Sequence, residues 1–117
     1  MCGACALDSQ KPQQLVHYVI VRPDLPRGLL AAQVVHAAGE SAGGDVPTGT
    51  FAVVLAAREI EAVEQRLTAA GVAHVAIRED DAPWAGALMA IGIRPSSRRI
   101  LKKHLSDLPL LGEREVP

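Results

Sequence analysis

The chain has few aromatic side chains, with one Phe, one Tyr and one Trp among its 117 residues. Because 49% of the residues are nevertheless hydrophobic, the core must be built from Val, Leu, Ile and Ala. This length fits a single domain with one sheet and its helices, and it leaves no room for separate catalytic and substrate domains. The shortage of aromatic residues also argues against base stacking as the main contact with a nucleic acid.

The chain also lacks an excess of charge, a long apolar run and a secretion signal. Its net charge of −1 gives no global attraction to nucleic acid or membranes, so binding of a polyanion would depend on a local patch. No apolar run approaches the ~18 residues of a membrane span, and the N-terminus lacks the basic and apolar regions of a signal peptide. We expect a soluble, cytoplasmic protein without a membrane partner.

Cysteine is scarce, since Cys2 and Cys5 form one CxxC pair and no further cysteine exists to complete a four-thiolate zinc site. The pair lies in residues 1–13, whose small and polar composition predicts a disordered N-terminal arm ahead of a domain over residues 14–117. We expect reduced thiols on a flexible tail, with a redox pair or half a metal site as the alternatives. No metal or cofactor is expected.

Four widespread functional motifs are absent. The sequence has no GxxxxGK(S/T) phosphate loop, no GxGxxG after the first predicted strand, no HExxH and no GxSxG nucleophile elbow. The enzyme classes that carry these motifs are poorly supported. A site must therefore be sought among polar residues at the ends of predicted strands.

The hydrophobic pattern predicts alternating strands and helices. Short β-branched runs predict strands over residues 15–22, 50–56, 72–78 and 87–93. Amphipathic or capped segments predict helices over residues 28–42, 58–70 and about 97–105. The order β–α–β–α–β–β–α indicates one layered α/β domain with a mixed, four-stranded sheet. The last dozen residues are expected to pack through Leu108, Leu110 and Leu111.

Polar residues gather after the first and third predicted strands and on the first helix. They are Arg22, Asp24, Gln33, His36, Asp80 and Asp81. On the helix, one predicted polar stripe holds Leu29, Gln33, His36 and Glu40, and a neighbouring apolar stripe holds Leu30, Val34 and Ala37. A partly desolvated loop carboxylate could act as a general base on water, with His36 orienting that water. The alternative is a solvated acidic turn, with His36 bonded to Glu40.

The last predicted helix carries the densest group of cations in the chain. Its basic residues are Arg98, Arg99, Lys102, Lys103 and His104. One interpretation is a salt-sensitive contact with RNA or phosphate. The other is a solvated face whose cations suit the C-terminal end of the helix dipole.

Three ordered segments resemble the second class of peptidyl-tRNA hydrolases, a small α/β family. They are the V-R-x-D-L turn at 21–25, the A-A-Q-x-x-H-A-A segment at 31–38 and the late G-I-x-P at 92–95. The resemblance covers about residues 15–111, and the ordered spacing is more specific than any one motif. Leu29 stands where the family carries a lysine, which makes the chain more similar to the divergent branch called peptidyl-tRNA hydrolase domain-containing protein.

The resemblance implies a four-stranded mixed sheet flanked by helices on both faces. It also implies hydrolysis of the ester between tRNA and a peptide or an N-blocked amino acid, with tRNA as partner and a homodimer as one assembly to test. Asp81 or Asp80 would be the base, and Gln33 and His36 would orient water and substrate. The substrate would be held by Arg22, Asp24, Arg98, Arg99, Lys102 and Lys103. The alternatives are a non-catalytic binding module of the same fold and a small-molecule enzyme that reuses the cleft.

Overall fold

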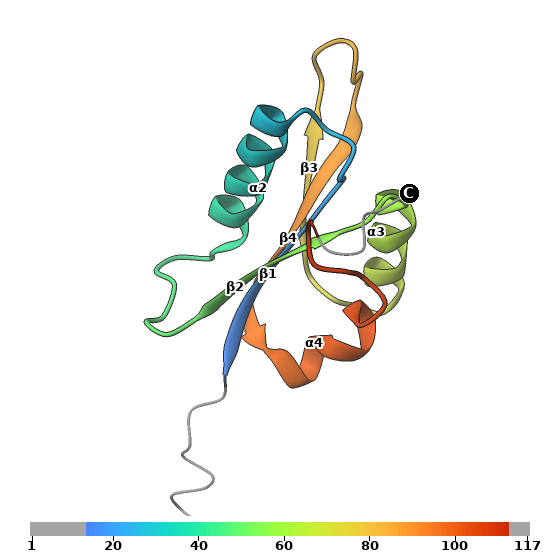
Figure 1. Cartoon of the computed structure of the whole chain (residues 1–117). Coiled ribbons are helices and arrows are strands. Elements are labelled where there is room, and N and C mark those ends of the chain that lie inside the picture. The colour runs from blue at the N-terminus through green and yellow to red at the C-terminus, as the bar shows by residue number, and fades with distance from the viewer. Residues whose placement is uncertain (1–13, 113–117) are drawn as a thin grey trace, which may run out of the picture.

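The computed structural model describes residues 14–112, which form a mixed sheet with helices on both faces (Figure 1). Its elements are β1 (Leu15–Val21), α2 (Arg27–Ser41), β2 (Phe51–Ala56), α3 (Ile60–Ala69), β3 (Val75–Glu79), β4 (Ala87–Ser97) and α4 (Arg98–Leu105). The predicted α/β class and the four-stranded mixed sheet are therefore confirmed. Residues 1–13, with Cys2 and Cys5, lie outside the described part of the chain.

The strands lie in the order β2-β1-β4-β3. β1 and β2 run parallel and pair Val16 with Phe51 and Val21 with Ala56, while α2 connects them. β4 runs antiparallel to both β1 and β3. For β3 and β4, the short connection leaves room for such a pair. The continuous apolar runs of β1 and β4 explain their central positions, because a central strand is buried on both faces.

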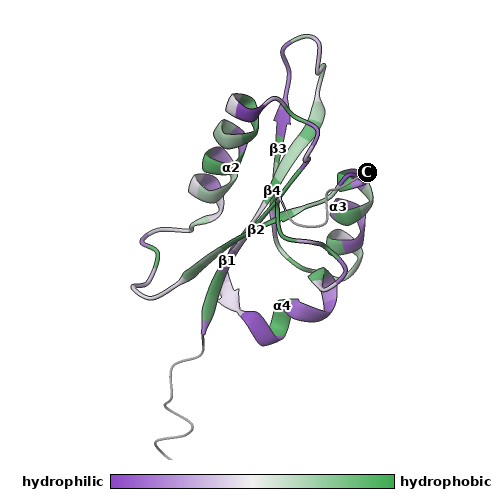
Figure 2. Ribbon diagram, in the orientation of Figure 1, coloured by the Kyte–Doolittle hydropathy of each residue, from purple (hydrophilic) through white to green (hydrophobic). Residues whose placement is uncertain are grey.

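Alternation along the strands divides the core into two clusters, one on each face of the sheet. α3 and α4 cover one face and α2 covers the other (Figure 1). The cluster under α3 and α4 includes Val16, Tyr18, Ile20, Leu55, Ile60, Leu67, Leu88, Ile91, Leu101 and Leu105. The cluster under α2 is built from Val19, Val21, Leu25, Ala37, Ile77, Met89 and Ala90. In Figure 2, the strands are mainly hydrophobic, whereas α4 is largely hydrophilic around its buried leucines.

α2 approaches β4 closely at Gly92. A Cβ atom on Gly92 would overlap the carbonyl oxygen of Ala37 and the hydroxyl of Ser41. That hydroxyl donates to the Ala37 carbonyl at 2.6 Å and lies 2.9 Å from Nε2 of the buried His17. Because Ser41 gives its one proton to Ala37, its oxygen accepts from a proton on His17 Nε2. Burial lowers the pKa of His17, so the neutral ring joins β1 to α2.

The chain after α4 returns along the outer edge of β2. The N–H of Ala56 donates to the Pro109 carbonyl, and the N–H of Leu111 donates to the Val54 carbonyl, each at 2.9 Å. Leu108 and Leu111 pack against the two clusters, whereas Leu110 is 44% exposed. The predicted packing of this segment is thus confirmed for two of its three leucines.

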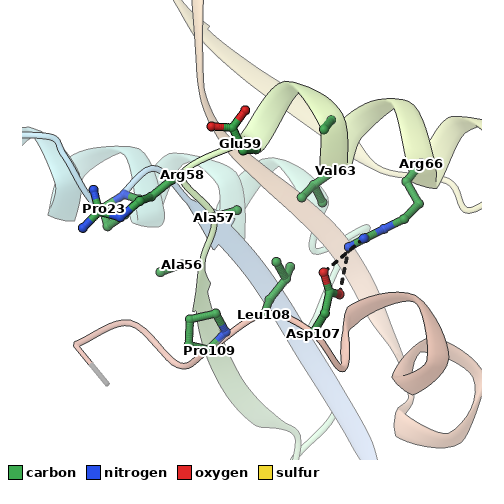
Figure 3. Close-up of a pocket in the computed structure, with 11 residues that line it drawn as sticks. Pro23, Ala56, Ala57, Arg58, Glu59, Val63, Arg66, Asp107, Leu108 and Pro109 are labelled. Atoms are coloured by element: carbon green, nitrogen blue, oxygen red, sulfur yellow. Dashed lines mark hydrogen bonds and ion pairs between the residues drawn. The ribbon is translucent and has the colours of Figure 1, made fainter. Parts of the chain in front are cut away.

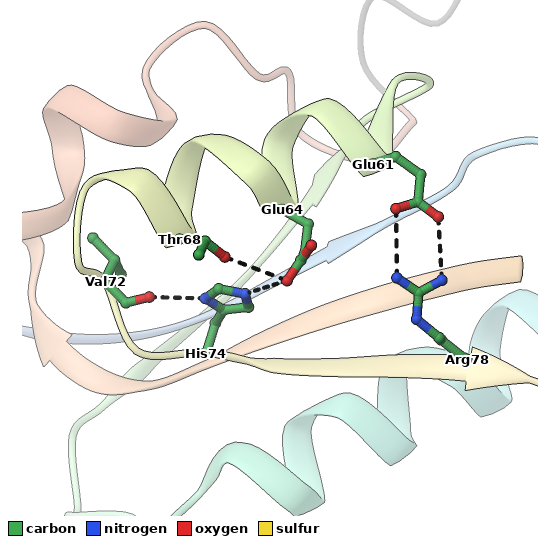
Figure 4. A network of polar contacts seen from close by, with 6 residues as sticks. All are labelled: Glu61, Glu64, Thr68, Val72, His74 and Arg78. Carbon is green, nitrogen blue, oxygen red and sulfur yellow. Dashed lines mark hydrogen bonds and ion pairs between the residues drawn. The ribbon is translucent and has the colours of Figure 1, made fainter.

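Polar side chains join α3 to β3 (Figure 4). Arg78 donates to Glu61 at 3.2 Å. The two ring nitrogens of His74 lie 2.8 Å from the Val72 carbonyl and 2.9 Å from Glu64. The hydrogen bond from His74 lowers the pKa of Glu64. The strand predicted to begin at Val72 begins instead at Val75, because the Val72 carbonyl turns to meet the imidazole.

The last strand is longer than predicted, since β4 continues through Pro95 to Ser97. Its pairing with β1 shifts between Val16 and Tyr18, so that two β4 residues face one on β1. A bulge of this kind tolerates proline, which cannot donate a ladder hydrogen bond. The predicted strand end at 93 is therefore wrong.

Candidate functional site

Gln33 lies in the first half of α2 and points into the fold. The residue is 5% exposed, and its Nε2 donates to Oε1 of Glu79 at 3.3 Å. Glu79 is the half-buried last residue of β3, and its Oε2 accepts the N–H of Asp81 at 3.3 Å. An amide and a carboxylate thus form a pair where β3 turns toward β4.

The carbonyl oxygen of Gln33 is buried and has no hydrogen-bond partner among residues 14–112. Glu79 fixes the orientation of the amide, because the reverse placement would set two acceptors against each other. A buried acceptor left unpaired costs about 1–3 kcal/mol. Such an acceptor is suited to bind a water molecule or a donor group of a ligand.

The predicted polar stripe of α2 is wrong in one respect, because Gln33 belongs to the buried side. The buried residues of the helix are Gln33, Ala37 and Ser41, spaced by four. The close contact at Gly92 turns Ala37 and Ser41 inward, and Gln33 lies one turn earlier on the same stripe. The side chain of His36 is 63% exposed, and its Nε2 lies 2.9 Å from Oε2 of Glu40.

The turn between β1 and α2 holds a paired arginine and aspartate. Arg22 donates to both carboxylate oxygens of Asp24, with Nε at 3.0 Å and Nη2 at 2.7 Å. This hydrogen-bonded pair lowers the pKa of Asp24 and raises that of Arg22. The charges of the two predicted binding residues therefore compensate each other, and the pair holds the turn.

Trp84 connects this turn to the β3–β4 loop. The guanidinium carbon of Arg22 lies 5.4 Å from the centre of the Trp84 ring, within cation–π range. Trp84 also packs on the cluster under α2, together with Leu29 and Leu30 at the start of that helix. Three segments distant in sequence therefore meet at one end of the sheet: the β1–α2 turn, the first half of α2, and the β3–β4 loop.

The predicted loop carboxylates Asp80 and Asp81 are both exposed. Within residues 14–112, neither carboxylate has a hydrogen-bond or ion-pair partner, although the Asp81 backbone bonds to Glu79 and Trp84. The structure therefore brings Gln33 to Glu79, while His36 and the two aspartates stand apart in solvent. Glu79 was not among the predicted site residues. The missed signal is period-two alternation, which places Glu79 on the same face as Val75 and Ile77, toward α2.

The basic helix α4 lies on the opposite face of the sheet from α2 (Figure 1). Its cations form two rows that line different grooves. Arg98 and Lys102 face a groove beside β2, while Arg99 and Lys103 face one beside the α3–β3 loop. The second groove, of about 610 Å³, is also lined by Arg94 and His104. No carboxylate of residues 14–112 lines it. β4 separates α4 from the Gln33–Glu79 end of the sheet by about 30 Å, at ~3.3 Å per residue.

A cavity of about 380 Å³ lies across the β1–α2 turn from Gln33, on the α3 face (Figure 3). Its walls are mostly apolar and include Pro23, Ala57, Val63, Leu108 and Pro109. At one side, Arg66 forms two 3.1 Å bonds to Asp107. This ion pair borders the cavity on that side, and Arg58 and Glu59 also line it.

Within residues 14–112, no three His, Cys, Asp or Glu side chains are grouped to hold a metal ion. None of the helices in the same range has the length and apolar character needed to span a bilayer.

Comparison with known proteins shows the fold alone. No family model and no curated protein matches the sequence. A solved structure of a protein of unknown function from Agrobacterium tumefaciens strain C58 is similar, with a TM-score of 0.50 and 17% identity. The match covers 83% of this chain and 97% of that chain.

Proposed function

We propose that the protein hydrolyses the ester between tRNA and a peptide or an N-blocked amino acid, at the site formed by Gln33 and Glu79. One observation carries the proposal: the buried amide of Gln33 holds Glu79, while its own carbonyl oxygen is buried without a partner among residues 14–112. The order of the motifs that resemble the second class of peptidyl-tRNA hydrolases also supports it.

In this mechanism Glu79, rather than Asp80 or Asp81, is the general base. Its two oxygens are positioned by Gln33 and by the Asp81 N–H, and it accepts a proton from water as the water oxygen bonds to the acyl carbon. The bond between the acyl carbon and the ribose oxygen then breaks, and Glu79 gives the proton to this departing oxygen. The products are tRNA with a free hydroxyl and a peptide carboxylic acid, which ionises in water. The Gln33 carbonyl orients the attacking water by accepting its second hydrogen.

The cations of α4 support binding of the tRNA phosphates at a distance from the ester. The row of Arg99 and Lys103 borders a groove that no carboxylate of residues 14–112 lines. A substrate that contacts both this groove and Gln33 must extend over the end of the sheet, about 30 Å along β4. A nucleic acid has that reach, whereas a small ester does not.

The assignment of the base is tested by two matched variants on an N-acetylaminoacyl-tRNA. Glu79→Gln keeps the shape of the side chain and removes the base, so the rate of tRNA release should fall by at least ~100-fold. The double variant Asp80→Asn, Asp81→Asn should stay within about threefold of wild type, because those carboxylates are exposed and have no partner in the part of the chain that the structure describes. If the double variant loses activity and Glu79→Gln keeps it, the general base is Asp80 or Asp81 and not Glu79.

A second candidate function is a non-catalytic module that binds tRNA. The exposure of Asp80 and Asp81 favours it, and so does the contact of His36 with Glu40 on the solvent side. So does the apolar Leu29, at the position where the resembling enzymes carry a cation. Such a module would bind tRNA with the same salt dependence and release no acyl group, so a binding assay and a release assay on one preparation distinguish the two.

A further inference from the structure

Among residues 14–112, only half of the outer edge of β2 is covered. Residues 109–111 pair with Val54 and Ala56, which direct their backbone groups outward. By the alternation of backbone groups along a strand, Ala52 directs its N–H and C=O to the same edge. Neither group has a partner among residues 14–112. The fold therefore shows that this edge accepts an added strand and leaves its first half open.

The open half of the edge carries the one phenylalanine of the chain. Phe51 is 56% exposed and shares a face with Val53 and Leu55. Beside them runs a groove of about 430 Å³ between β2 and α4, lined chiefly by apolar side chains. Leu110, which is 44% exposed, also lines this groove. An exposed aromatic next to an apolar groove is typical of a binding surface.

The charge of this groove is of one sign. Arg98 and Lys102, one turn apart on α4, are the charged residues that line it. Both are exposed, and neither side chain has a carboxylate partner in the described part of the chain. The groove thus combines an open strand edge, apolar pockets and two available cations.

We propose that the open edge at Phe51–Val53 docks an extended acidic peptide segment of a partner protein. The peptide adds a strand next to β2, and its backbone bonds to the N–H and C=O of Ala52. Alternate side chains of an added strand face the same side, so its apolar residues lie on Phe51 and Val53. Acidic residues flanking these meet Arg98 and Lys102. This proposal does not depend on ester hydrolysis.

The first test uses the full chain and an acetylated Val–Glu peptide of sequence Glu-Thr-Val-Thr-Val-Thr-Glu, in which the Val and Glu side chains share one face of the added strand. Its binding is followed by amide hydrogen exchange and NMR titration. Binding should slow exchange at Ala52 and shift the signals of Phe51–Val53. The matched Val–Lys peptide, with Lys in place of both Glu residues, should bind at least tenfold more weakly. Equal binding of both peptides, or an unchanged Ala52 amide under saturating Val–Glu peptide, would overturn the proposal.

Variants with matched controls test the two sides of the groove. Arg98→Glu with Lys102→Glu should weaken binding of the acidic peptide at least tenfold, whereas Arg99→Glu with Lys103→Glu, on the neighbouring row, should not. Phe51→Ser should also weaken it. Its control is Val35→Ser, because Val35 is an apolar residue on α2 that is 72% exposed. Equal effects of the paired variants would contradict the docking site.

Other occupants of the groove give distinct results, each of which overturns the proposal. If a chain ending at Gly112 binds the peptide more than tenfold tighter, the groove belongs to the chain's own last residues. If wild-type protein self-associates and Phe51→Ser does not, it belongs to a second copy. If a single-stranded RNA displaces the peptide and Arg98→Glu with Lys102→Glu abolishes that RNA binding, it belongs to nucleic acid.

Discussion

Substitution of Gly92 by alanine should destabilise the protein strongly, because α2 rests on this residue. The added methyl group would overlap the Ala37 carbonyl and the Ser41 hydroxyl, with the Ser41 Cβ at 2.8 Å. Ordinary contacts begin near 3.5 Å, so the helix must shift and strain the bond between Ser41 and His17. Overpacking of this kind costs about 1–3 kcal/mol. We expect a loss of about 2–3 kcal/mol, which lowers Tm by roughly 10–15 °C for a domain of this size.

Gly39→Ala is the matched control, measured by the same thermal and urea unfolding. Gly39 lies in α2 two residues before Ser41, and a Cβ there would meet nothing within 4 Å. Alanine should therefore stabilise the helix by about 0.4–1 kcal/mol. A Gly92→Ala protein as stable as wild type would refute the close packing of α2 on β4, and with it the reason that Gln33 faces inward.

Two pH dependences follow from the shifted groups. Because Arg22 lowers the pKa of Asp24, the pair stabilises the fold above pH ~4 and this stabilisation is lost as pH falls below it. In Asp24→Asn, the free energy of unfolding measured in urea should depend less on pH below ~4, by no more than about 1 kcal/mol, because the pair is partly exposed. The same dependence on pH in wild type and variant would contradict this. Burial lowers the pKa of His17, so the unfolded chain takes up the proton first and stability should fall below pH ~6.5. The contribution of His17 is the difference in unfolding free energy between wild type and His17→Gln at each pH. A difference that stays constant between pH 7 and 5 would count against it.

The arrangement of the sheet follows from the sequence because its strands carry strong local patterns. The apolar runs of β1 and β4 require burial on both faces, and the short connection after β3 permits only an antiparallel return. The limits of β4 did not follow. Pro95 reads as a strand end, and only pairing with β1 across a bulge lets the strand pass through it.

The candidate site was predicted in part. The sequence places Gln33 and an acidic loop at one end of the sheet, and that much is in the structure. Which carboxylate meets Gln33 depends on the face that α2 turns inward, and tertiary contact at Gly92 decides this rather than helical periodicity. Glu79 therefore takes the place next to Gln33 that was expected for Asp80 or Asp81.

The central claim is tested most directly by the rate at which purified wild-type protein releases tRNA from an N-acetylaminoacyl-tRNA. We expect release well above the spontaneous rate, lost in Glu79→Gln and in Gln33→Leu, with both variants folded by circular dichroism. Wild-type protein that binds the substrate and leaves its ester intact at the spontaneous rate would contradict the account.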